Sequence, residues 1–304
     1  MQMERAVDGF FAISGCLIVA SWDRTSSARE YFMRRAKRIL PGYLLALVFT
    51  LLVGSILTQL PIGAFWKHPT TWKYIGCNLL FLNFLSPDLP GVFASNPSTS
   101  AMNPALWTIK VEVAFYLFVP VLVWLVRRLG RSAALTSMFA ISAIYRIAFE
   151  HLGRDGLAKQ LPGQLVFFIM GAAVYYFFPE FVAHRRKIWL VAIVLFVASE
   201  MKDWFLLDAV GTPLFVLCLA FLLPPYRGIT RYGDFSYGTY VLHCPLVQML
   251  VALGVFAWSP WGAVGIVIVS VWALGVFSWF AVERRFLRPG RVRQQETEAA
   301  AQVA

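Results

Sequence analysis

The segment SYGTYVLHCP, residues 236–245, places a histidine inside an apolar stretch. In a helix, spacings of four and three residues bring Ser236, Tyr240 and His243 to one face, and Pro245 then loosens the backbone. An imidazole can move a proton near neutral pH, and a neighbouring hydroxyl can orient it. We therefore predict that His243 acts as a general acid or base. The alternative is that His243 is a buried residue that only packs and forms hydrogen bonds.

A carboxylate lies in a second apolar run, LWTIKVEVAFYL, residues 106–117. A helix places Thr108, Glu112 and Tyr116 on one face, whereas Lys110 points elsewhere. Because charge is expensive inside a bilayer, Glu112 is the second functional candidate. The alternative is a Glu112 at the membrane surface, paired with a basic group from another part of the chain.

Basic residues crowd a segment that we predict to be a loop before a span, at Arg34, Arg35, Lys37 and Arg38. Forked guanidinium groups bind phosphates well. The same charges also serve as a topology signal or bind anionic lipid headgroups. Their spacing alone does not choose between these roles.

Other candidate chemistry is sparse. Ser14 and Gly15 lie in the first apolar run, where small residues allow helices to approach closely. The four cysteines are isolated within apolar stretches, so we expect neither a disulfide nor a metal site. The sequence carries no phosphate-binding loop, zinc motif, nucleophile elbow or dinucleotide fingerprint.

The elements that hold these residues must be membrane helices. Of 304 residues, 59% are hydrophobic and 14% charged, against roughly 45–50% and about 25% in soluble domains. Since about 20 apolar residues span a bilayer, we predict an all-α, polytopic helical bundle of nine spans. They fall near residues 8–21, 39–60, 107–126, 133–150, 162–178, 188–200, 205–223, 236–257 and 262–281.

Two segments differ from these spans. Residues 73–86 form a short apolar run that we expect to be re-entrant or interfacial. Residues 288–304 are polar and then rich in Ala, Gln and Glu, which predicts a disordered tail after a single membrane domain over residues 1–287.

The net charge is +11. The basic residues responsible for it lie in short runs between apolar segments, as the positive-inside rule describes for cytosolic loops. Nucleic acid is therefore not an expected partner. The basic loops predict cytosolic positions for residues 22–38, 127–132, 179–187, 224–235 and the tail. The segment 87–106 carries only Asp88 and is rich in Pro, Ser and Asn, which predicts an external loop.

Five motifs in order resemble the integral-membrane acyltransferase 3 family. They are VDGFFAISGCLI at 7–18, FMRRAKRILPGY at 32–43, LWTIKVEVAFYL at 106–117, SYGTYVLHCPL at 236–246 and ERRFLRP at 283–289. The resemblance implies a ten-span bundle that moves an acetyl or similar acyl group from cytosolic acetyl-CoA, or another acyl-CoA, to a hydroxyl of a lipid-linked or cell-surface glycan. It also implies a bacterial inner membrane location.

The resemblance also implies roles for residues. Arg34, Arg35 and Arg38 match the basic motif and would hold the phosphates of the coenzyme. Glu112 and His243 match positions that line the acyl path or the acceptor pocket.

Supporting polar residues on the matching motifs are Trp107, Thr108, Ser236, Tyr240 and Ser14. Members of the family carry a further first span with an arginine and a histidine, which residues 1–7 are too few to form. We therefore expect that span to be missing here, through a late start or in an inactive remnant.

Two other functions stay open at this stage. A glycan or lipid transporter or flippase would also need intramembrane polar groups and a basic cytosolic face. A non-catalytic membrane partner is the third reading. Dependence on an acyl-CoA donor separates the enzyme from both.

Overall fold

The computed structural model describes residues 2–97, 99–202, 204–224 and 233–287. In these ranges every regular element is a helix, which confirms the predicted fold class. Each of the nine predicted apolar runs lies on a helix. Among the described residues, seven helical segments are long and apolar enough to cross a membrane, namely Glu4–Asp23, Ala28–Leu57, Leu106–Leu129, Arg131–His151, Asp155–Tyr176, Phe205–Leu222 and Pro260–Phe286. The helices at the predicted spans 188–200 and 236–257 are not among these seven.

The chain divides into two compact units. Unit 1 comprises Met1–Phe32 and Val111–Tyr226, and unit 2 comprises Met33–Lys110 and Arg227–Ala304. The helices α2 (Ala28–Leu57) and α5 (Leu106–Leu129) each continue from one unit into the other. A single domain over residues 1–287 stays a prediction.

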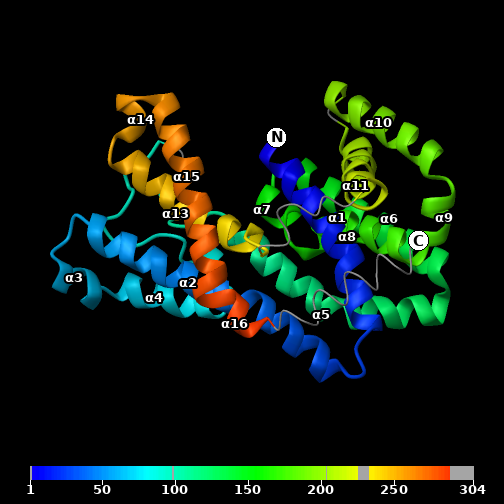
Figure 1. The fold of residues 1–304 in the computed structure, drawn as a ribbon, viewed down its shortest axis with the longest axis horizontal. Coiled ribbons are helices and arrows are strands. Elements are labelled where there is room, and N and C mark those ends of the chain that lie inside the picture. Colours follow the sequence, from blue (N-terminus) through cyan, green and yellow to red (C-terminus); the bar gives the residue numbers. More distant parts are fainter. Residues whose placement is uncertain (1, 98, 203, 225–232, 288–304) are drawn as a thin grey trace. The chain divides into compact units, whose positions relative to one another are not determined.

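Unit 1 is built around the pair of α1 and α8, which lie side by side in Figure 1. A Cβ on Gly15 would lie 2.0 Å from the backbone oxygen of Phe168, and one on Gly171 would lie 1.8 Å from that of Ala12. Only glycine allows this approach, so the predicted packing role of the small residues near Ser14 fits the structure. The helices of this unit are α1 (Gln2–Asp23), α6 (Arg131–His151), α7 (Asp155–Ala158), α8 (Leu161–Tyr176), α9 (Phe178–Ala183), α10 (Arg185–Met201) and α11 (Phe205–Leu222).

Unit 2 has an apolar core between α2, α4 and the long connection that follows α4. Buried Leu47 and Val53 of α2 belong to it together with Phe65, Tyr74 and Met102. A second cluster joins α13 to α15 through Leu246, Leu250 and Val271. The further elements of this unit are α3 (Ile62–Lys67), α4 (Pro69–Leu79), η1 (Asn83–Leu85), α13 (Ser236–Ala252), α14 (Val255–Trp258), α15 (Pro260–Ser278), η2 (Trp279–Glu283) and α16 (Arg284–Phe286).

The expected loop over residues 22–38 is wrong from residue 28 onwards, because α2 already begins at Ala28. Ser27 starts this helix by accepting a hydrogen bond from the Glu30 amide, while the Glu30 carboxylate accepts one from the Ser26 amide. These two bonds satisfy free amides at the helix start. The basic residues Arg34 and Arg38 therefore share one helical face instead of lying in a loop.

Two other boundaries also differ from prediction. The run 236–257 ends its helix at Ala252, because Gly254 adopts a positive φ of 72° before the short α14. The first helix begins at Gln2, well before residue 8. The run 73–86 holds most of α4 and all of η1, and its re-entrant placement stays a prediction. The predicted tail, 288–304, and residues 225–232 lie outside the described residues.

Candidate functional site

His243 has a defined ring orientation on α13. Its Nδ1 lies 2.5 Å from the backbone oxygen of Tyr240, and its Nε2 lies 3.1 Å from the Cys244 sulfur. A carbonyl oxygen can only accept a hydrogen bond, so the neutral ring carries its proton on Nδ1. Nε2 is then the basic nitrogen, and it faces the thiol.

The turn that carries His243 is tied to the start of α5. The Tyr240 hydroxyl lies 2.7 Å from the Thr108 hydroxyl, and the Asn103 amide donates to the backbone oxygen of Val241 at 2.9 Å. The structure thus brings together Tyr240 and Thr108, which the sequence predicted from separate motifs. Ser236 engages elsewhere, since its hydroxyl donates to Asp234 at 2.5 Å.

Arg38 lies between two carboxylates of unit 2. Its guanidinium contacts Asp234 at 2.5 Å and Glu283 at 3.6 Å. The Glu283 side chain is 1% exposed and also accepts a hydrogen bond from Ser278 at 2.6 Å. Sequence reasoning did not single out Glu283 or Asp234, although Glu283 opens the motif ERRFLRP.

Two glycines allow the helices around Glu283 to approach. A Cβ on Gly42 would lie 2.6 Å from the Tyr237 ring, and one on Gly238 would lie 2.6 Å from Ser278 and 3.0 Å from Glu283. The buried carboxylate therefore occupies a space that α2 and α13 leave open for it. Arg34 and Arg35 lie one turn earlier on α2 and are both partly exposed.

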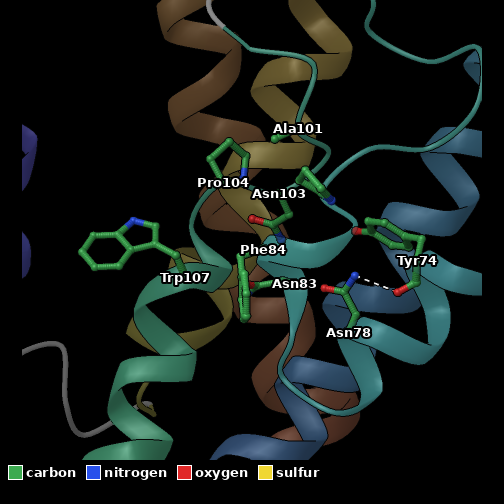
Figure 2. Close-up of a pocket in the computed structure, with 9 residues that line it drawn as sticks. Tyr74, Asn78, Asn83, Phe84, Ala101, Asn103, Pro104 and Trp107 are labelled. Atoms are coloured by element: carbon green, nitrogen blue, oxygen red, sulfur yellow. Dashed lines mark hydrogen bonds between the residues drawn. The ribbon is translucent and has the colours of Figure 1, made fainter. Parts of the chain in front are cut away.

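A cavity of about 110 Å³ lies in unit 2, between α4, η1 and the start of α5. Figure 2 shows Tyr74 and Asn78 on one side of it and Trp107 on the other, with Asn83 and Asn103 between them. Burial raises the pKa of the Tyr74 hydroxyl, which therefore stays protonated. Trp107, predicted only as a supporting residue, is part of the cavity wall.

The other predicted residues lie in unit 1. Glu112 is 8% exposed, and its carboxylate accepts a hydrogen bond from the Tyr116 hydroxyl at 2.6 Å, one turn further along α5. Ser14 is buried on α1. A shared site of Glu112 or Ser14 with His243 stays a prediction.

Unit 1 also holds a polar cluster that the sequence did not reveal. Arg5 of α1 pairs with Glu200 and, at 3.3 Å, with Asp208 of α11, and it donates to the backbone oxygen of Ser199 at 2.9 Å. Asp208 also accepts a hydrogen bond from Thr212 at 2.6 Å. Ion pairs and hydrogen bonds of Arg5 thus connect α1 with α10 and α11. In the described ranges no three His, Cys, Asp or Glu side chains are grouped as a metal ion requires.

Comparison with known families agrees with this helical architecture. The acyltransferase domain model matches residues 4–280, nearly the whole chain. A multi-pass membrane enzyme that transfers acyl groups is the class that this match and the helices define. The chain belongs to the acyltransferase 3 family.

Three relatives are similar along most of their length. Nodulation protein 10 of Rhizobium leguminosarum bv. viciae is 27% identical, over 90% of this chain and 80% of its own. The O-acetyl transferase of Shigella phage Sf6 is 26% identical, over 93% and 84%. The exopolysaccharide production protein ExoZ of Rhizobium meliloti is 26% identical, over 98% and 94%. No solved structure matches the chain.

Proposed function

We propose that this protein is an O-acyltransferase of the bacterial inner membrane that moves an acetyl or similar acyl group from cytosolic acyl-CoA to a hydroxyl of a lipid-linked or cell-surface glycan. The names of two relatives, an O-acetyl transferase and an exopolysaccharide production protein, support the reaction type and the acceptor class. The observation that carries the proposal is the oriented ring of His243, with its proton on Nδ1 and its base at Nε2.

The reaction needs a base at the acceptor hydroxyl. The hydroxyl oxygen attacks the thioester carbonyl carbon, so a C–O bond forms and the C–S bond breaks. His243 Nε2 accepts the hydroxyl proton and returns it to the departing sulfur of the coenzyme. Rotation of the Cys244 side chain opens Nε2 to the hydroxyl. The bond from Nδ1 to the Tyr240 carbonyl keeps the ring in the required tautomer.

The basic face of α2 supports the donor assignment. Arg34, Arg35 and Arg38 supply three guanidinium groups within five residues, and coenzyme A presents several phosphates. Arg38 has two unlike partners, since Glu283 is buried and Asp234 is 48% exposed. In our proposal, Glu283 keeps Arg38 in place while a phosphate of the donor replaces the exposed Asp234.

The experiment uses membrane vesicles from cells that express the full chain, with radiolabelled acetyl-CoA as donor and the label counted in the glycan fraction. His243→Gln should lower kcat by about 10²–10⁴, the usual contribution of a general base, with little change in the donor KM. His184→Gln is the matched control, because His184 is exposed at the end of α9 and should leave the rate unchanged. Label that enters glycan equally well in the His243→Gln vesicles would refute the assignment.

A further inference from the structure

The cavity of unit 2 has a buried polar floor. The side chains of Asn78, Asn83 and Asn103 line it and are 1%, 8% and 7% exposed. Within the described part of the chain, one side-chain atom of each has no hydrogen-bond partner. They are the oxygens of Asn78 and Asn103 and the nitrogen of Asn83. All three residues line the same space, and their unpaired atoms are buried beside it. Buried amides with unused hydrogen-bonding groups are what a polar ligand site requires.

The two free oxygens are fixed by the bonds of their own amide nitrogens. The Asn78 nitrogen donates to the backbone oxygen of Tyr74 at 2.9 Å, and the Asn103 nitrogen donates to that of Val241 at 2.9 Å. An amide flip would lose either bond. Two unused acceptors and, at Asn83, one unused donor therefore lie buried in the residues of the floor.

The rim of the cavity is aromatic and apolar. Phe84 is 55% exposed, Trp107 is partly exposed, and Pro87 and Pro104 complete this side. As far as the structure describes the chain, the nine lining residues carry no charge. The volume of about 110 Å³ is several times the roughly 10–15 Å³ that one water needs.

We propose that this cavity binds one uncharged sugar ring of the acceptor glycan; the choice of a glycan rests on the proposed function. A sugar hydroxyl both donates and accepts, so neighbouring hydroxyls of one ring can satisfy the oxygens of Asn78 and Asn103 and the nitrogen of Asn83. The C–H face of the ring packs on Phe84 and Trp107. A uronate or phosphate fits less well than a neutral ring, because none of the nine lining residues carries a charge and the cation beside them, Lys110 Nζ, already lies 4.4 Å from the centre of the Phe84 ring.

The position of the cavity suits this ligand. Asn103 binds the backbone of Val241, two residues before His243, so the wall of the cavity is joined to the helix that carries the proposed base. The connection that supplies Pro87, Ala101 and Asn103 is the segment for which the charge pattern predicts an external position. An acceptor from the outer face therefore reaches α13 without passing the basic residues of α2.

The test measures binding without any acyl donor. Purified full-length protein in lipid nanodiscs is titrated with tritiated neutral trisaccharides of glucose, galactose, rhamnose and N-acetylglucosamine, and with a trisaccharide that ends in glucuronate. At least one neutral sugar should bind, and the glucuronate should bind at least tenfold more weakly than it. Phe84→Ala and Asn83→Ala should each weaken binding by about tenfold, the effect of one lost aromatic contact or hydrogen bond.

Leu85→Ala is the matched control, because Leu85 is the next residue of η1, is 50% exposed and does not line the cavity. Phe84 is exposed, so its replacement tests the site even if Asn83→Ala fails to fold. In acyl transfer, Phe84→Ala should raise the acceptor KM and leave the donor KM unchanged.

The outcomes separate the two proposals. Sugar binding that Phe84→Ala weakens, without any acetyl transfer, would support the cavity and contradict the proposed function. Acetyl transfer with an unaltered acceptor KM in Phe84→Ala and Asn83→Ala would mean that the cavity holds water only, and the sugar site would be overturned. Failure of all the neutral sugars to bind would overturn it as well.

Discussion

At the scale of single residues, the thiol of Cys244 contacts the basic nitrogen of His243. It lies 3.1 Å from His243 Nε2, and a thiol is a weak hydrogen-bond donor. We expect Cys244→Ala to change the rate of acyl transfer by less than about tenfold, because it removes one weak contact and no reacting group. The rate measured beside that of His243→Gln checks this, and a loss as large as that of His243→Gln would make Cys244 an acyl carrier.

A second residue-scale prediction concerns the pair of Arg38 and Glu283. Arg38→Gln leaves the buried Glu283 charge without its cation, so we expect a loss of about 3 kcal/mol of unfolding free energy, as for other broken buried pairs. Glu283→Gln keeps a partner for Ser278 and removes the charge. The double variant should therefore be more stable than Arg38→Gln alone.

Equilibrium unfolding in mixed detergent micelles measures the unfolding free energies of the parent, the two single variants and the double variant. Lys37→Gln is the control, because Lys37 is the exposed neighbour of Arg38 on the same helix. Additive effects of Arg38→Gln and Glu283→Gln would show that the two side chains are not coupled.

The sequence motifs predicted part of the candidate site around His243. The motif around His243 gave Tyr240 as its neighbour, and the rings of the two residues lie 5.6 Å apart. Glu283 and the three cavity amides were not predicted, because their significance depends on burial and on partners far away in the chain. Arg38 and Glu283 are separated by most of the sequence, and no local pattern joins them.

At the scale of helices, a glycine sets how closely α13 packs against the end of α15 and against η2. Gly238→Ala should destabilise the protein by about 1–3 kcal/mol, because the added methyl meets Ser278 in a filled interior. Gly76→Ala on α4 is the matched control, since nothing lies within 4 Å of its Cβ position. That change should stabilise its helix by about 0.5–1 kcal/mol.

Thermal unfolding of both variants in the same nanodiscs distinguishes these effects. Equal unfolding temperatures for Gly238→Ala and the parent would mean that α13 can shift away from η2 without loss.

Helices were easier to predict than their ends. Each of the seven candidate membrane helices in the described ranges contains most or all of one of the predicted apolar runs, because the bilayer forces backbone groups to bond within each segment. The polar start of α2 was missed because it extends beyond the apolar run, although Ser27 and Glu30 carry a capping signal. The end of α13 was missed because residues 253–257 remain apolar, and only Gly254 interrupts them.

At the scale of the whole molecule, the charge pattern predicts how the chain crosses the membrane. In a chain whose four native cysteines are replaced by alanine, Ser95→Cys should react with a membrane-impermeant maleimide in intact spheroplasts. Arg128→Cys should react only after the membrane is opened, because it lies at the end of α5, for which the charge pattern predicts a cytosolic position. Both positions are exposed in the structure. The opposite labelling pattern would reverse the orientation.

The division into two units could not be predicted from the sequence. It depends on contacts between α1 and helices that follow residue 110, and between α2 and helices that follow residue 232. The amino-acid composition shows that each segment is apolar. It does not show which helix packs against which, because that depends on the shapes of the two helix surfaces in contact.

The glycine contact between α1 and α8 also bears on how the protein is made. Gly15 and Gly171 are about 150 residues apart, and a ribosome that adds about 5–20 residues per second needs roughly 8–30 s to reach α8 after α1. Until then α1 lacks its partner helix, and Asp208 of α11, which pairs with Arg5, is translated later still. A helix that carries an unpaired charge is costly to release into lipid. We therefore expect the insertion machinery to retain α1 until the second half of unit 1 has been translated.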